Sequence, residues 1–298
     1  MPDFHLQTLQ PETRDRFNRA VARLPRSLSS YALAAHLLWR DHFTFRWAEV
    51  GDHFLLFAEY DGCVYMPLPP LGPFDPAIIS DCFSWMDARN PDGRISRIEN
   101  IAEEDEAFYR DTGWITEAKS PEYVYRRSAL ADLRGDAYKT ARGACNAFIR
   151  RYPPSDRPYR PDDQPAALAL LSRWQGQRRH ADSIYQQMIL DSESVHRRAL
   201  AEWAEIGLTG WVIEVDGDLI GYTFGFPLCG DTFCVALEVT DLTFSGAAAH
   251  LFRTFCRTLT AYKWINTMDD SELPNLRRVK EAYRPVRRQG CFLARRDR

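Results

Sequence analysis

The sequence lacks the short motifs that mark several large enzyme classes. It contains no G-x-S-x-G elbow, no Walker-type phosphate loop and no G-x-G-x-x-G fingerprint. Serine hydrolases, P-loop nucleotide hydrolases and dinucleotide-dependent enzymes are therefore disfavoured. The seven histidines form no H-E-x-x-H spacing and the seven cysteines form no C-x-x-C pair. We therefore expect no metal site, and reduced core thiols of the kind found in cytoplasmic proteins.

Strong net charge and long apolar runs are also missing. The formal net charge is −3, so the chain as a whole has no pull toward nucleic acid or anionic lipid, and any basic surface must be local. The longest apolar runs fall far short of the roughly 20 residues of a spanning helix, and no leader peptide is visible. With 45% hydrophobic and 27% charged residues, the chain is expected to be a folded, cytoplasmic protein without a transmembrane segment.

The order of predicted elements indicates two α/β halves. Segments with helical spacing alternate with short strand-like runs along the whole chain. An E-x-D-G turn lies between two strand-like runs in each half, at residues 59–62 and 214–217. We therefore expect an α/β (α+β) protein with an N-terminal half at 1–125 and a C-terminal half at 126–298.

The stretch 264–285, WINTMDDSELPNLRRVKEAYRP, opens like a buried strand and closes like an amphipathic helix. At 100° per residue the helix has an apolar stripe that also contains Lys280; the stripe is Leu273, Leu276, Val279 and Tyr283. A buried ammonium needs an anionic partner, and Asp269 and Asp270 are the nearest in sequence. The alternative is an aspartate that caps the helix and a lysine whose stem runs out to the surface.

The strand DTFCVALEVT, residues 231–240, carries small side chains on one predicted face. Two-residue alternation places one set toward the core, namely Phe233, Val235, Leu237 and Val239. The opposite face then has Thr232, Cys234, Ala236 and Glu238. A row of small side chains with a glutamate at its end leaves room for a ligand. A face exposed to solvent, or one packed closely against a helix, would show the same pattern.

A helix predicted within residues 138–152 carries polar side chains along one ridge. Lys139, Arg142, Asn146 and Arg150 recur at helical spacing beside an apolar stripe of Tyr138, Ala141, Cys145, Ile149 and Tyr152. A row of cations suits phosphates or another extended anion. A solvated basic face would look the same.

The order of these motifs resembles one known family. YVYRRSALADLRGDAYKTARGACNAF, VDGDLIGYTFG, DTFCVALEVTD and INTMDDSELPNLRRVKEAYRP are similar to the C-terminal domain of phosphatidylglycerol lysyltransferases and its stand-alone soluble relatives. The resemblance implies tandem acetyltransferase-like (GNAT) halves with mixed sheets. It also implies transfer of an aminoacyl group from a charged tRNA, with the transfer site in the C-terminal half.

The sequence departs from that family in two places. After Ile265 and Asn266 it reads Thr-Met-Asp-Asp, where the family commonly has an arginine, two glutamates and an aspartate. Lysine is therefore not implied as the transferred amino acid. The acyl-CoA loop of acetyltransferases is reduced to TFSGAA around Gly246, without its basic or amide lead residue.

The leading hypothesis is an aminoacyltransferase with no tightly bound cofactor. Transfer from an ester passes through an oxyanion and needs hydrogen-bond donors and a path for a proton. Lys280, Asn266 and Glu238 are the catalytic candidates, and Lys139, Arg142 and Asn146 would bind donor phosphates. The residues expected to bind substrate or to shape the pocket are Asp231, Asp269, Asp270 and Tyr283.

Two alternatives remain open at the level of sequence. The first is an N-acetyltransferase that uses acyl-CoA, and the second is a non-catalytic module that binds a metabolite. The expected partners are tRNA and a small-molecule, peptide or lipid acceptor, and the oligomeric state is not indicated.

Overall fold

The computed structural model describes residues 3–24, 26–178 and 183–297. The chain divides into two compact units. Unit 1 contains residues 1–122 and 288–298, and unit 2 contains residues 123–287. Within the described ranges, no helix is both long and apolar enough to cross a membrane.

Unit 1 is built on a four-stranded antiparallel sheet in the order β1-β2-β3-β4, with a further antiparallel pair, β5 and β12. Its elements in chain order are β1 (Gln7–Thr8), α1 (Arg14–Ala22), α2 (Leu33–Leu38), β2 (Thr44–Val50), β3 (His53–Tyr60), β4 (Cys63–Tyr65), α3 (Pro76–Asp87), β5 (Ile98–Ala102), α4 (Glu103–Asp111), the first part of β6 (Ile115–Arg126) and most of β12 (Arg287–Arg295).

Alternation along β3 explains how unit 1 packs. Phe54 is buried on one face, where it contacts Phe17 of α1 edge-on, with ring centroids 5.6 Å apart. Leu55 and Phe57 belong to the opposite core, which also takes in apolar side chains of α3, β5 and α4. Because neighbouring strand residues point to opposite faces, the sheet buries both of its faces against helices.

Unit 2 has a mixed sheet in the order β6-β11-β10-β9-β8-β7. All neighbouring pairs are antiparallel except β10 and β11, which are parallel. Its elements are the end of β6, α5 (Arg127–Asp132), α6 (Lys139–Arg151), β7 (Ser155–Pro158), α7 (Gln164–Gln177), α8 (Ser183–Ile206), β8 (Thr209–Val215), β9 (Asp218–Pro227), β10 (Thr232–Thr240), α9 (Ala247–Thr258), β11 (Trp264–Asn266) and α10 (Pro274–Ala282).

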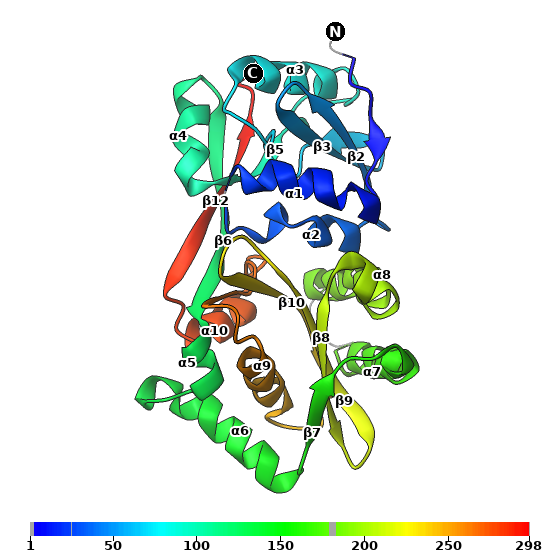
Figure 1. The fold of residues 1–298 in the computed structure, drawn as a ribbon, viewed down its shortest axis with the longest axis vertical. Helices are drawn as coiled ribbons and strands as arrows, with labels where there is room; N and C mark the ends of the chain where they lie inside the picture. Colours follow the sequence, from blue (N-terminus) through cyan, green and yellow to red (C-terminus); the bar gives the residue numbers. More distant parts are fainter. Residues whose placement is uncertain (1–2, 25, 179–182, 298) are drawn as a thin grey trace. The chain divides into compact units, whose positions relative to one another are not determined.

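Helices cover both faces of the unit 2 sheet (Figure 1). Helices α5, α6 and α9 pack together on one face, and α7 and α8 cover the other. The α9 side buries Phe233, Val235 and Phe255, while Tyr222 contacts His196 of α8 on the other side. The parallel pair β10 and β11 is connected through α9, the crossover that parallel strands require.

The structure differs from the expected halves at the end of the chain. The expected division at 125/126 lies close to the observed change of unit after Glu122, within β6. Residues 288–298, expected in the C-terminal half, belong to unit 1 because β12 pairs with β5. This pairing joins segments far apart in sequence, and no local pattern signals it.

Two predicted apolar stripes are buried only in part. No residue of α10 is fully buried, and Val279 is 54% exposed. On α6, Ile149 is 41% exposed while Phe148 is buried. The helices form where expected, and the other stripe members are buried or half-buried, including Cys145 of α6 and Tyr283 after α10.

Candidate active site

The parallel strands β10 and β11 separate shortly after they begin. Their pairing covers Thr232 to Cys234 on one side and Trp264 to Asn266 on the other. Strand β10 then continues to Thr240, whereas the chain after Asn266 turns away into the loop that precedes α10. The edge of β10 beyond Cys234 therefore has no β11 partner, and residues 236–238 keep partial access to solvent.

A β-bulge in β10 decides which way Glu238 points. Val235 pairs with Gly225 and Leu237 with Phe224, so Ala236 is an extra residue in β10. An extra residue shifts the two-residue alternation by one. Glu238 therefore lies opposite Thr223, on the face of Phe233 and Val235 that α9 covers. The expectation that Glu238 lies on the opposite face from these residues is wrong for this reason.

The bulge leaves the carboxyl group of Glu238 in an apolar setting. Within the described part of the chain no group forms a hydrogen bond to it, and Cys256 of α9 and Tyr283 are close enough to interact electrostatically with it. Burial raises the pKa of Glu238 from 4.5 to about 8. A carboxyl group that titrates near neutral pH at the open end of a split strand pair is suited to accept a proton.

Tyr283 lies beside Glu238 at the end of α10. Its ring packs edge-on against Phe252 of α9, with centroids 5.2 Å apart. Burial, together with the neighbouring Glu238, raises the pKa of the Tyr283 phenol. The phenol therefore stays protonated at neutral pH and can act as a hydrogen-bond donor next to the carboxyl group. Tyr283 was expected in the pocket wall, and the structure brings it and Glu238 together.

The ammonium of Lys280 is bound by backbone carbonyl groups of the loop before α10. It donates to the carbonyl oxygens of Thr267, Met268 (3.2 Å) and Asp269 (2.5 Å). The bond to Asp269 is thus made to its backbone and not, as expected, to its carboxylate. Lys280 is half-buried, and its three donors fix the path of this loop.

Asp270 is fully buried and has its own partners. Its carboxylate accepts hydrogen bonds from Tyr123 Oη and Arg277 Nε, each at 2.7 Å, and from the amide of Glu272 at 3.0 Å. Burial alone would raise the pKa of Asp270, but the bonds from Arg277, Tyr123 and the amide lower it to about 2. Asp270 is therefore an ionised anchor of the loop.

The loop itself contains three non-glycine residues with positive φ, each preceded by a side chain that supports it. Met268, Ser271 and Glu272 have φ of 62°, 48° and 59°. The amide of each donates to the side-chain oxygen two residues earlier, on Asn266, Asp269 and Asp270 respectively. These side-chain hydrogen bonds stabilise the left-handed backbone conformation, which is unfavourable for non-glycine residues that lack such support. Three of the predicted site residues therefore shape the loop.

Of the other predicted residues, Asp231 lies far from Glu238, and Lys139, Arg142 and Asn146 lie on α6. Asp231 precedes the first residue of β10, and at about 3.3 Å per residue its backbone is roughly 20 Å away along the strand. Lys139 and Asn146 are exposed on α6. Arg142 donates to the carbonyl oxygens of Leu133 (2.5 Å) and Gly135 (2.8 Å), which fixes the turn before α6.

The turn before α9 carries an anionic side chain. The carboxylate of Asp241 accepts hydrogen bonds from Gln177 (2.8 Å) and from the amide and hydroxyl of Thr243 (3.0 and 2.7 Å). Burial raises the pKa of Asp241, but these bonds outweigh it, and the pKa is lowered overall. At Gly246 (φ +91°) an added Cβ would lie 2.6 Å from the carbonyl oxygen of Ala144 in α6. Close helix packing therefore accounts for this glycine.

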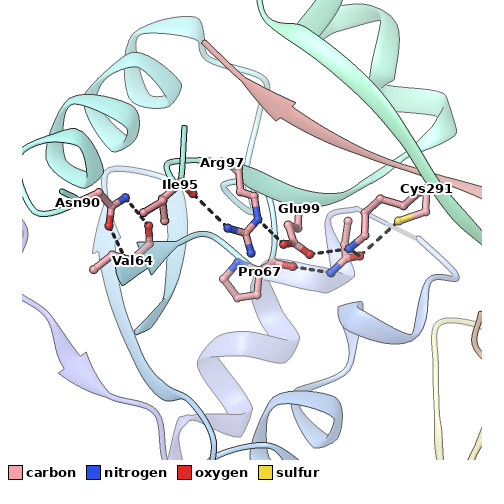
Figure 2. Close-up of polar contacts among 9 residues, drawn as sticks. Val64, Pro67, Asn90, Ile95, Arg97, Glu99 and Cys291 are labelled. Atoms are coloured by element: carbon pink, nitrogen blue, oxygen red, sulfur yellow. Dashed lines mark hydrogen bonds and ion pairs between the residues drawn. The ribbon is translucent and has the colours of Figure 1, made fainter. Parts of the chain in front are cut away.

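Unit 1 has an equivalent parallel contact, which is closed. A bridge between Met66 and Ile98 is parallel, and α3 lies in the connection between them. Beyond the bridge, Asn100 Nδ2 donates to the carbonyl oxygen of Pro67 at 2.9 Å, and Pro67 is buried. Figure 2 shows this link and the neighbouring pair of Arg97 and Glu99. In unit 2 the pairing of β10 and β11 ends at Cys234 and Asn266, and the desolvated carboxyl group of Glu238 lies beyond it on β10, so we place the candidate site in unit 2.

Sequence reasoning missed the tyrosines of β6. Tyr123 and Tyr125 alternate on one face of the strand, and their hydroxyls donate to Asp270 (2.7 Å) and to the carbonyl oxygen of Lys280 (3.0 Å). The Y-x-Y spacing in residues 123–125 was the available signal, since alternate strand residues share a face. The partnership of Arg277 with Asp270 was not foreseen either. Among the residues described there is no cluster of side chains suited to hold a metal ion.

Comparison with solved structures defines the class. A conserved protein of unknown function from Bacteroides thetaiotaomicron VPI-5482 matches with a TM-score of 0.89 and 22% identity, over 98% of this chain and 99% of that one. A tandem GNAT protein from the clavulanic acid biosynthesis pathway matches with a TM-score of 0.51 and 12% identity, over 98% of both chains. The protein has the tandem acetyltransferase-like (GNAT) fold with mixed sheets that was expected.

The family follows from the sequence comparison. Residues 21–295 match the family described as phosphatidylglycerol lysyltransferase, C-terminal. The chain belongs to this family. L-PGS from Bacillus licheniformis has a TM-score of 0.69 and 15% identity, over 96% of this chain and 92% of that one. A comparison with curated protein sequences found no match.

Proposed function

We propose that the protein transfers an aminoacyl group from an aminoacyl-tRNA to an amine or hydroxyl group of an acceptor, with Glu238 as the general base. Family membership and fold are consistent with an acyl- or aminoacyltransferase. The observation that carries the proposal is the desolvated carboxyl group of Glu238, with its pKa of about 8, at the open separation of β10 and β11.

The proposed reaction needs one proton acceptor and donors for one oxyanion. Glu238 takes the proton from the acceptor's amine or hydroxyl as that group attacks the ester carbonyl carbon. The tetrahedral intermediate then breaks the bond to the tRNA ribose oxygen, which receives the proton from Glu238. The Tyr283 hydroxyl and backbone amides on the open edge of β10 are the donors nearest to this chemistry.

In this proposal Lys280, Asn266, Asp269 and Asp270 are positioning residues. Asn266 is completely buried and bonded to the amide of Met268 at 2.6 Å, so its contact is with the chain. Lys280 holds the same loop through its carbonyl groups. Their contribution is to hold the loop beside β6, where the amide of Thr267 donates to the carbonyl oxygen of Tyr123, and so away from the unpaired edge of β10.

A local excess of positive charge supports a polyanionic donor. Residues 126–151 and 247–263, which include α5, α6 and α9, carry ten lysines and arginines and only two acidic residues, in a chain of net charge −3. Exposed Lys139 and Arg150 belong to this set. Cations collected on one side of a sheet are suited to contact a nucleic-acid backbone.

The turn before α9 disfavours acyl-CoA as the donor. In an acetyltransferase-like fold a donor pyrophosphate would be placed at this helix N-terminus, where backbone amides attract anions. Here the ionised carboxylate of Asp241 already accepts the amide of Thr243. This carboxylate is also paired with Arg173 at 3.4 Å, so the objection to a pyrophosphate here is the amide that Asp241 already occupies, which makes the coenzyme the second candidate.

The test is transfer of label from a pool of radiolabelled aminoacyl-tRNAs, with cell extract supplying acceptors. We expect label in a new product with the wild-type protein, loss of at least a hundredfold in rate for Glu238→Gln, and no change for Glu104→Gln, an exposed glutamate of α4. A folded Glu238→Gln protein with full activity would remove Glu238 from the mechanism. Transfer from acetyl-CoA, with none from any aminoacyl-tRNA, would overturn the choice of donor.

A further inference from the structure

A hollow in the surface of unit 1 lies between α1 and the turn that joins β2 to β3. Its cavity volume is about 100 Å³, which is smaller than the sites of drug-sized ligands and suits a single small group rather than a whole large ligand. One side is lined by Arg16 and Arg19 of α1 and by Arg23, which directly follows the helix, and Glu49 and Asp52 line the other. None of these residues takes part in the site proposed for acyl transfer.

Helix geometry brings the three arginines into one row. Positions 16, 19 and 23 follow the i, i+3, i+7 spacing that places residues on one helical face, spread over roughly 10 Å. The helix is fixed in rotation by Phe17, which is completely buried against Phe54. The row therefore faces the hollow because the apolar side of α1 is held by the core.

The outer two arginines are anchored and the middle one is not. Arg16 pairs with Glu49 at 2.9 Å and lies 5.4 Å from the centre of the Trp47 ring. Arg23 donates to the carbonyl oxygen of Asp52 at 3.4 Å and lies 3.8 Å from its carboxylate. Arg19 is exposed, and no partner for it is found in the described part of the chain. One guanidinium is thus left uncompensated between two fixed ones.

The opposite wall of the hollow is also firmly held. Phe54 and Leu71 exchange backbone hydrogen bonds of 3.0 and 2.9 Å, and His53 Nε2 bonds the carbonyl oxygen of Pro73 at 2.8 Å. At Gly72 an added Cβ would lie 2.9 Å from the carbonyl oxygen of Asp52. Glycine here allows the segment to pack directly on the turn. The hollow is therefore pre-formed, which lowers the entropy lost on binding.

We propose that this hollow binds a small molecule through a phosphate group that Arg19 contacts directly, with Arg16 and Arg23 on either side. A phosphate offers several oxygens and more than one negative charge, so it can face neighbouring guanidinium groups at once. A single carboxylate, by contrast, can be fully bound by the two parallel N–H groups of one guanidinium. The proposal does not depend on the aminoacyltransferase activity.

Isothermal titration of the full chain with pyrophosphate tests the site. We expect saturable binding by the wild-type protein that weakens between 50 and 200 mM salt. Arg19→Ala should lower the affinity at least tenfold and Arg19→Glu should abolish binding, with unchanged melting temperatures because the side chain is exposed. The matched control is Arg134→Ala, a highly exposed arginine of unit 2, and it should bind as the wild type does.

Two results would overturn the proposal. The first is pyrophosphate binding that is absent from the wild-type protein or equal in the wild-type and Arg19→Glu proteins. The second is tighter binding of succinate than of pyrophosphate, which would assign the site to carboxylates.

Discussion

Replacement of Glu238 by glutamine tests two properties of its buried carboxyl group: its effect on folding stability and its role as a proton acceptor. The wild-type carboxyl titrates near pH 8 in the folded chain, against 4.5 for an ordinary glutamate. Between these values the folded state holds a proton that the unfolded state has released. The wild-type protein therefore loses stability as the pH rises through this interval, and the glutamine variant does not.

The size of the effect follows from the same pKa. A change from 4.5 to about 8 corresponds to at most about 5 kcal/mol, since each tenfold change in proton affinity is worth about 1.4 kcal/mol. Residual access to water reduces this limit, and we expect about 2 to 3 kcal/mol. Glu238→Gln should thus gain that much stability, relative to wild type, between pH 4.5 and pH 9.

Urea unfolding of both proteins at a series of pH values measures this difference. The comparison across pH cancels any constant effect of the new amide, because glutamine does not titrate. Single-turnover rates of the wild-type protein should rise with pH up to about 8, as the base becomes ionised. A stability difference that stays constant from pH 4.5 to pH 9 would refute the desolvated carboxyl and the role built on it.

Three further substitutions test the supporting structure, each by urea unfolding at pH 7. Asp270→Asn should lower the free energy of unfolding by about 2 kcal/mol, because the low pKa of Asp270 contributes stability above pH 4 that is lost as the pH falls through about 2. The control Asp269→Asn should cost less than half of that, and equal losses would contradict the anchoring role of Asp270. Lys280→Met leaves carbonyl groups of the loop unpaired, so we expect a loss of about 1 to 3 kcal/mol together with slower transfer, and a fully stable variant would show that the loop holds without the ammonium. Gly246→Ala should lose more than 1 kcal/mol because of its positive φ and the 2.6 Å approach of a carbonyl oxygen, and an unchanged stability would contradict that packing.

The basic helices of unit 2 make a separate prediction about donor binding. The charge-reversed double variant Lys139→Glu/Arg150→Glu should weaken tRNA binding at least tenfold at 50 mM salt and flatten its salt dependence, because fewer counterions are released. Arg94→Glu, an exposed position in unit 1, serves as the control in a filter-binding assay. Equal affinities for the two variants would place tRNA elsewhere or remove it as the donor.

Periodic patterns in the sequence were sufficient to predict the elements but not their contacts. The strand–helix prediction for 264–285 is confirmed by β11 and α10, and the helix predicted within 138–152 is confirmed by α6. The degree to which each member of a stripe is buried was not predictable, because neighbouring elements decide it. Val279 falls in a good apolar stripe and is nevertheless 54% exposed. The loop residues were singled out correctly as unusual, but a sequence does not show whether Asp270 meets Lys280 or Arg277.

The bulge at Ala236 marks the limit of reasoning from periodicity. Strict alternation assigned Glu238 to the face of Cys234, and a single unpaired residue moves it to the face of Val235. The consequence is chemical as well as geometric, because on that face the carboxyl group meets Tyr283 and Cys256 and becomes a weak acid. The extra residue can be recognised only when β10 is aligned with β9, because register is a property of two paired strands. The same strand without the bulge would place this carboxylate on the other face of the sheet, so the candidate base depends on Ala236 as much as on Glu238 itself.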